Sequence, residues 1–156
     1  MDTPLKSRPA PGPIPTLEAR HQTAVLGSLT IHGRAEEVAG ARAFVTRTLA
    51  ATGKGQRVDS DAATLLTSEL VTNAIQHTAS GASDGSVTIV IVDVPDGVLI
   101  EVIDDGSAGT PVVKGDLFAA DGHGLYLVQQ LAAQWGYLRD PAGTTVWFHL
   151  ADHAGG

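Results

Sequence analysis

The stretch TSELVTNAIQHT, residues 67–78, puts polar side chains on a helix face that would otherwise be apolar. Asp59 and Ser60 precede a run without Gly or Pro, and either side chain can cap the free N–H groups of a helix start. We therefore expect a helix from about residue 59 to Thr78 that ends before Gly81.

The helical period sorts these side chains onto one arc. At about 100° per residue, the arc that would face the core holds these apolar residues: Ala62, Ala63, Leu66, Leu70 and Ala74. Glu69, Asn73 and His77 fall on the same arc at four-residue spacing, so they point in one direction. Burying them without partners would cost roughly 1–3 kcal/mol for the amide and more for the charge. Either hydrogen bonds to a loop satisfy them, or they face a ligand or a hydrated cation; three in register favour the ligand or cation.

The composition limits the classes of protein to which the chain can belong. The chain has 156 residues, enough for one domain with a core, and 43% of them are hydrophobic. The formal charge of −7 argues against nucleic acid or an anionic membrane as a partner, because both require a basic surface. The chain has no cysteine, so it has no disulfide and no thiolate site. The apolar run Val87–Val94 is too short to span a bilayer and no signal-like core opens the chain, so we expect a cytoplasmic protein.

Proline divides the chain into an arm and a domain. Residues 1–22 hold five of the eight prolines, and we expect a flexible arm there, either solvated or used for docking. We expect one folded domain over residues 23–151 and a short tail over residues 152–156.

Local patterns predict the elements of that domain. The expected order begins with a strand over residues 23–32 and two helices over residues 36–51 and 59–78. Two strands follow over residues 87–94 and 98–104, then a helix from residue 122, and finally two strands over residues 137–138 and 146–150. Gly53-Lys54-Gly55 ends the first helix, and Pro95-Asp96-Gly97 joins two strands in a hairpin. In the last helix these residues should face the core: Leu125, Leu127, Val128, Leu131 and Ala132. This order predicts an α/β (α+β) two-layer sandwich, a mostly antiparallel sheet covered on one face by three helices.

Two glycine motifs stand where a ligand could bind. Asp104-Asp105-Gly106 ends a strand and can bring an acidic acceptor to a ligand, although Asp-Gly after a strand usually marks only a turn. Gly122-His123-Gly124 opens a helix whose free N–H groups would favour a phosphate, although glycine before a helix is common. Walker-type, Rossmann and serine-hydrolase signatures are absent, and the six histidines show no paired metal-ligand spacing on one helix.

Four segments taken together resemble one family. ELVTNAIQH (69–77), VIDDG (102–106), GHGLYLV (122–128) and GTTVWF (143–148) are similar, in order and spacing, to the N, G1, G2 and closing-strand motifs of the Bergerat-fold (GHKL, histidine-kinase-like) ATPases. The resemblance runs from about Ile31 to Leu150. Its closest branch is the bacterial anti-sigma factor serine/threonine kinases and their single-domain relatives. It implies the Bergerat ATP-binding fold, with ATP and Mg²⁺ as cofactors.

The resemblance implies roles for five of these residues. Asn73 would hold the Mg²⁺ ion, and Glu69 would orient or deprotonate the attacking hydroxyl or a metal-bound water. Asp104 would accept a hydrogen bond from the exocyclic amine of adenine, and Gly106 would let the base approach the backbone. Thr145 would complete adenine binding through its hydroxyl or a water. Oxygen ligands of this kind suit magnesium.

The phosphate side of the site is implied in the same way. Residues 107–121 would form the ATP lid, with Gly109 as the second glycine of the G1 motif, and His77 would be a structural hydrogen-bonding residue. The amides of the two G2 glycines would cradle the phosphates, within a motif made of Gly122, His123, Gly124 and Leu125.

Two functions from different classes remain. The first is a kinase that binds a sigma factor and phosphorylates a serine of a small anti-sigma factor antagonist protein; a homodimer is compatible with it. The second is a non-enzymatic module whose bound ATP sets its shape for a partner. Glu69 favours the kinase, whereas His123, where many relatives have Arg, and Lys114, the only cation among residues 107–121, leave room for the module. A sensor histidine kinase fragment is disfavoured, because no dimerisation helix pair with a phosphoacceptor histidine precedes the domain.

Overall fold

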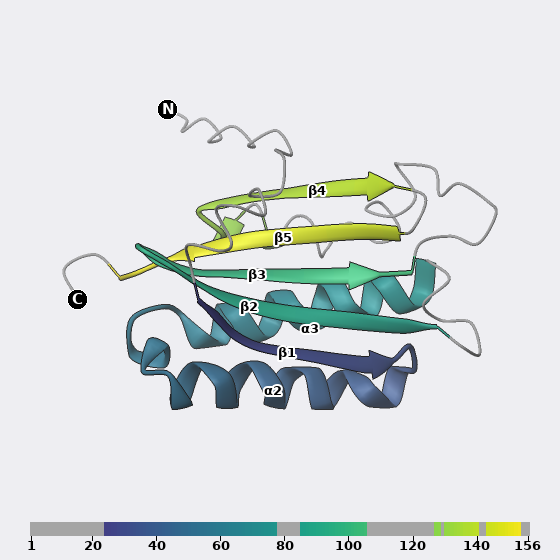
Figure 1. Ribbon diagram of the computed structural model, residues 1–156, viewed down its shortest axis with the longest axis horizontal. Helices are drawn as coiled ribbons and strands as arrows, with labels where there is room; N and C mark the ends of the chain where they lie inside the picture. The colour runs from purple at the N-terminus through teal and green to yellow at the C-terminus, as the bar shows by residue number, and fades with distance from the viewer. Residues whose placement is uncertain (1–23, 78–84, 106–126, 129, 141–142, 154–156) are drawn as a thin grey trace.

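Figure 1 shows the computed structural model of the chain, which describes residues 24–77, 85–105, 127–128, 130–140 and 143–153. Within these ranges the chain forms a five-stranded sheet in the order β1-β2-β3-β5-β4, and every neighbouring pair is antiparallel. The strands are β1 (Val25–His32), β2 (Ser86–Val94), β3 (Gly97–Asp104), β4 (Gln134–Asp140) and β5 (Gly143–Ala151).

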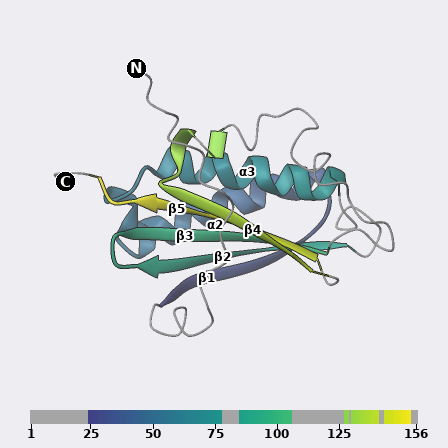
Figure 2. The ribbon, with the colours of Figure 1, turned by 90° about the horizontal axis from the view of Figure 1, so that it is seen from above.

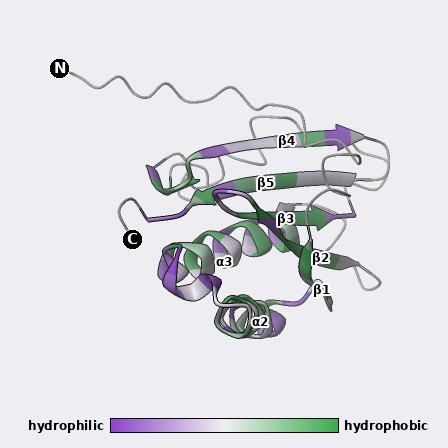
Figure 3. Ribbon diagram, turned by 60° about the vertical axis from the view of Figure 1, so that its left-hand side comes forward, coloured by the Kyte–Doolittle hydropathy of each residue, from purple (hydrophilic) through white to green (hydrophobic). Residues whose placement is uncertain are grey.

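The helices lie on one face of this sheet, as Figures 2 and 3 show. The helical segments are η1 (Ala35–Glu37), α2 (Val38–Ala51), η2 (Lys54–Gln56) and α3 (Ser60–His77). Helix α3 packs on β3 and β2, and α2 packs on β1 and on α3. Residues 127, 128, 130 and 131 are also helical, and Val128 is buried in the same core. The predicted fold class, an antiparallel sheet with helices packed on one face, is confirmed.

Helix α3 begins and packs as its sequence predicts. The backbone N–H of Ala62 donates to Oδ1 of Asp59 across 3.0 Å, so Asp59 is the residue that caps the helix. All five residues of the predicted core arc are buried, with exposed fractions of 0 to 4%. Burial of this arc is the main stabilisation of the helix, because an isolated helix of this length is only marginally stable in water.

Alternation along the strands separates the two faces of the sheet. On β3, Val98, Ile100 and Val102 join the core beneath the helices, whereas Leu99 belongs to a second cluster on the opposite face. Asp104 therefore shares the helix face with Val102, because side chains two residues apart point to the same side.

Glycines make the expected turns. Gly53 has φ 78° and ends α2, as predicted. Val94 pairs with Gly97, so Pro95 and Asp96 alone connect β2 to β3. Gly97 has φ 151°, and a Cβ on it would lie 1.9 Å from the carbonyl oxygen of Leu150. The hairpin can pack against β5 only because this residue is glycine.

Two details differ from the expectation. Strand β4 begins at Gln134 rather than Tyr137, because Trp135 and Tyr137 point to the core in alternation with small or polar neighbours. The prediction that Leu131 faces the core is wrong, because the exposed fraction of this residue is 40%. It is the last helical residue before the chain turns into β4, and Ala132 and Trp135 pack on the core instead.

None of the helices in the described ranges is both long and apolar enough to cross a lipid bilayer. The predicted arm over residues 1–22, the turn near residues 81–84, the loop of residues 106–121 and the start of the last helix lie outside the described residues.

Candidate functional site

Asp104 is the last residue of β3 and lies on the helix face of the sheet. Only 6% of it is exposed, and its Oδ1 accepts a hydrogen bond from the backbone N–H of Thr144 across 3.0 Å. It pairs with Val87 near the start of β2, at the end of the sheet where α3 also ends (Figure 1). An acidic acceptor is thus fixed in direction at the edge of the core.

Gly143 brings β5 against the backbone of Asp104. It has φ 155°, and a Cβ on it would lie 2.0 Å from the carbonyl oxygen of Asp104. No other residue type fits this contact without a shift of the backbone. The glycine of the GTTVWF segment therefore sets the position of Asp104 directly.

Asp105 continues this end of the sheet on its exposed side. Its Oδ2 accepts a hydrogen bond from the backbone N–H of Ser86 across 2.8 Å, which ties the end of β3 to the start of β2. The two neighbouring carboxylates thus differ in environment, because Asp104 is buried beside the core and Asp105 is exposed at the end of the sheet.

Helix α3 contributes two polar side chains from one face. Asn73 is 9% exposed, Glu69 is half-buried, and they lie one turn apart, each next to a buried residue, Ala74 and Leu70 respectively. Neither side chain forms a hydrogen bond or ion pair within the described part of the chain. Two polar side chains one turn apart on a largely buried helix face are suited to a polar ligand. His77 is the last residue of α3, and its side chain is not described.

The two threonines at the start of β5 point to opposite faces. Thr145 pairs with Ile103, on the face away from the helices, whereas Thr144 is 4% exposed and lies on the helix face beside Asp104. The structure therefore favours Thr144, rather than Thr145, as the hydroxyl next to Asp104. Sequence reasoning missed Thr144, although its two-residue spacing from the core residue Val146 is the signal that identifies it.

The remaining predicted site residues lie outside the described residues: Gly106, Gly109, Gly122, His123, Gly124 and Leu125. The structure thus describes two parts of the predicted site, the α3 face with Glu69 and Asn73 and the β3 end with Asp104, on a helix and a strand that pack on each other.

The donor set suits a metal that is shared with a ligand. The described residues hold no group of three or more His, Cys, Asp or Glu side chains that could bind a metal by themselves. Mg²⁺ is usually held by one or two protein oxygens together with phosphate oxygens and waters. The amide oxygen of Asn73 fits that pattern, with Glu69 one turn away.

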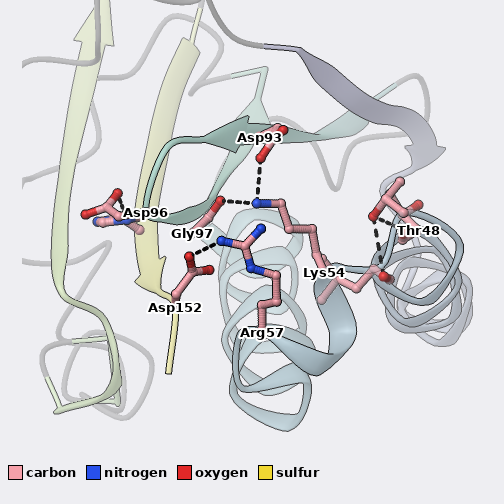
Figure 4. Close-up of polar contacts among 10 residues, drawn as sticks. Thr48, Lys54, Arg57, Asp93, Asp96, Gly97 and Asp152 are labelled. Carbon is pink, nitrogen blue, oxygen red and sulfur yellow. Dashed lines mark hydrogen bonds and ion pairs between the residues drawn. The ribbon is translucent and has the colours of Figure 1, made fainter. Parts of the chain in front are cut away.

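Sequence reasoning also missed a polar cluster at the opposite end of the sheet, shown in Figure 4. The Nζ of Lys54 is 2.6 Å from Oδ1 of Asp93 and donates to the carbonyl oxygen of Gly97 across 3.3 Å. Arg57 pairs with Asp152 nearby. In the sequence Lys54 lies between Gly53 and Gly55, and such a segment predicts only a turn. The cluster ties η2 to the β2–β3 hairpin and is structural.

Comparison with models of protein families identifies a family for this chain. A model of the histidine kinase-like ATPase domain family matches residues 31–150. This range includes α3, the end of β3 and the start of β5, which together carry the candidate site. A search of curated proteins found no match to the chain.

Proposed function

The chain belongs to the histidine kinase-like ATPase domain family, and from this premise we propose that it is an ATP–Mg²⁺-binding regulatory kinase that phosphorylates a serine of a small antagonist protein. The observation that supports the proposal is the end of β3, where Thr144 and Gly143 fix the carboxylate and backbone of Asp104 on the face of the sheet against which α3 packs.

The β3 end would recognise adenine. The carboxylate of Asp104 would accept a hydrogen bond from the exocyclic amine of the base, and guanine offers a carbonyl at the corresponding place. The Thr144 hydroxyl lies on the same face of the sheet and would supply a second polar contact. Because the backbone N–H of Thr144 already holds Oδ1 of Asp104, the carboxylate needs no reorientation when the base binds.

The α3 face would hold the phosphate end. The amide oxygen of Asn73 would bind Mg²⁺, and the bound ion would neutralise charge on the phosphates. Glu69, one turn earlier and half-buried, would orient the attacking serine hydroxyl and accept its proton. In phosphoryl transfer, positioning and charge neutralisation supply most of the rate enhancement, so these two residues carry the chemistry proposed here.

The proposed partners are a sigma factor and its antagonist protein, as in the branch of the family that the motifs resemble. A second candidate is a non-catalytic module that uses bound ATP to regulate a partner. It is favoured by His123 between the G2 glycines and by Lys114 as the only cation of residues 107–121, because transfer usually requires more positive charge near the γ-phosphate.

Transfer from labelled ATP to small antagonist proteins separates the two candidates. For the kinase, Glu69→Gln should keep ATP affinity and lower serine phosphorylation by roughly two to four orders of magnitude, the usual contribution of a positioned base. The matched control is Gln76→Ala, an exposed position on the same helix, which should change neither quantity. A parent protein that binds ATP–Mg²⁺ and yet phosphorylates none of the antagonists would reject the kinase in favour of the module.

A further inference from the structure

Helix α3 carries a ridge of residues at four-residue spacing that includes both of its candidate site residues. The ridge consists of Asp61, Leu65, Glu69 and Asn73, and we call it the α3 ridge. Side chains four positions apart are neighbours on a helix surface, and each step turns the ridge by about 40° around the helix axis. The α3 ridge therefore winds from one side of the helix toward its core face.

Exposure falls steadily along the α3 ridge. Asp61 is exposed, Leu65 is 40% exposed, Glu69 is half-buried and Asn73 is 9% exposed. The helix runs toward the end of the sheet where β3 ends at Asp104 (Figure 1). The ridge thus connects the protein surface with the residues proposed to act on the phosphates.

The fold leaves the polar side chains of the outer ridge unused. Ser68, on the neighbouring ridge of α3, accepts a hydrogen bond from Nη1 of Arg42 on α2 across 3.2 Å. By contrast, the side chains of Asp61 and Glu69 form no hydrogen bond or ion pair in the described part of the chain. Two acidic side chains with an exposed leucine between them are therefore available to a partner.

We propose that the α3 ridge binds the serine-bearing segment of the substrate protein in an extended conformation. The inference rests on the proposed kinase function and states what the acceptor segment must carry. Four helical residues advance about 6 Å, and two residues of an extended chain advance about 6.6 Å. Side chains two positions apart in an extended chain point to the same side. A serine at Glu69 therefore places the second residue from it over Leu65 and the fourth over Asp61.

Each position of the ridge selects a different type of side chain. Leu65 favours an apolar residue, because the contact removes its exposed surface from water. Asp61 favours Lys or Arg, through charge complementarity at the surface. The acceptor segment thus has an apolar residue two positions from the serine and a basic residue four positions from it. This spacing holds for either direction of the bound chain.

Two peptides of the same composition test the spacing. Lys-Ala-Leu-Ala-Ser-Ala-Leu-Ala-Lys matches the ridge in both directions, whereas Lys-Ala-Ala-Leu-Ser-Leu-Ala-Ala-Lys points its leucines to the other side. With the full chain and ATP–Mg²⁺, the KM for phosphorylation of the matched peptide should be about tenfold lower. Leu65→Gln should abolish this preference and leave the Kd for ATP unchanged. Leu138→Gln, at a leucine of β4 that is 47% exposed, is the control and should retain the preference.

Asp61→Asn tests the basic position. Asparagine removes the charge and keeps a polar side chain in the first turn of the helix. The parent should prefer the matched peptide several-fold over a version with glutamine in place of both lysines, and Asp61→Asn should lose this preference. An equal preference in the parent and in Asp61→Asn would remove Asp61 from the docking surface.

A binding measurement separates this inference from the proposed function. Fluorescent versions of the two peptides, with alanine in place of serine, report a Kd for the ATP–Mg²⁺-loaded chain without any transfer. If the parent phosphorylates no acceptor, the kinase function is wrong, but a tenfold preference in Kd that Leu65→Gln abolishes would still support the ridge as a docking surface. Equal Kd values for the two peptides in the parent, or a preference that persists in Leu65→Gln, would overturn the inference whether or not transfer occurs.

Discussion

The backbone N–H of Thr144 donates a hydrogen bond to Oδ1 of Asp104 across 3.0 Å, in a part of the fold that is almost fully buried. This contact joins the first residues of β5 to the last residue of β3, which are adjacent strands of the sheet. It gives a buried carboxylate one fixed direction before any ligand arrives. Recognition by a preorganised acceptor costs less than recognition by one that must be ordered on binding.

Asp104→Asn tests the adenine contact. The side-chain oxygen can still accept from Thr144, so the fold should remain, but one carboxylate oxygen becomes an amine donor. We expect the Kd for ATP to rise about ten- to a hundredfold, the usual worth of a hydrogen bond to a charged group, and the preference for ATP over GTP to fall. Asp105→Asn is the matched control, because its exposed side chain can still accept from Ser86. Unchanged selectivity in Asp104→Asn would remove this residue from the base site.

Gly143→Ala tests the close approach of β5 to Asp104. The added Cβ would lie 2.0 Å from the Asp104 carbonyl oxygen, so the backbone must shift at the site. Gly97→Ala creates a similar clash, 1.9 Å from the Leu150 carbonyl oxygen, at the other end of the sheet. Both variants should lose about 1–3 kcal/mol of unfolding free energy. Only Gly143→Ala should also weaken ATP binding when measured well below its Tm; equal ATP affinities in the two variants would separate Gly143 from the site.

Lys54→Met tests the polar cluster at the far end of the sheet. Lys54 is 6% exposed, and its removal leaves the Gly97 carbonyl oxygen without that donor. We expect denaturant unfolding to show a loss of about 1–3 kcal/mol with ATP affinity unchanged. Arg57→Met removes an exposed pair with Asp152 and should cost less than about 1 kcal/mol. A larger loss in Arg57→Met than in Lys54→Met would contradict the structural role given to Lys54.

Local signals were sufficient for much of the fold. Helix α3 follows from a cap at Asp59 and a regular apolar period, and both are properties of neighbouring residues. The β2–β3 hairpin follows from the Pro95-Asp96-Gly97 turn between two apolar runs. Asn73 and Asp104 stood out in the sequence because polar side chains interrupt an apolar face or follow an apolar strand.

Other features depend on contacts between distant segments. Thr144 and Thr145 are neighbours of the same type, and only the register of β5 against β3 shows which one lies beside Asp104. Lys54 is buried because the β2–β3 hairpin folds over it. Glu101 is buried on the face opposite the helices, and its strand sequence does not predict that burial.

We propose that Asn73 on α3 and Asp104 on β3 belong to one ATP–Mg²⁺ site. Calorimetric titration of ATP into the parent, Asn73→Ala and Gln76→Ala, each with and without Mg²⁺, tests it most directly. Alanine has a high helix propensity, so both variants should fold as the parent does. We expect the parent and Gln76→Ala to bind one ATP per chain in the presence of Mg²⁺, and Asn73→Ala to lose the Mg²⁺-dependent binding. Equal Mg²⁺-dependent affinity in Asn73→Ala and the parent would contradict the account.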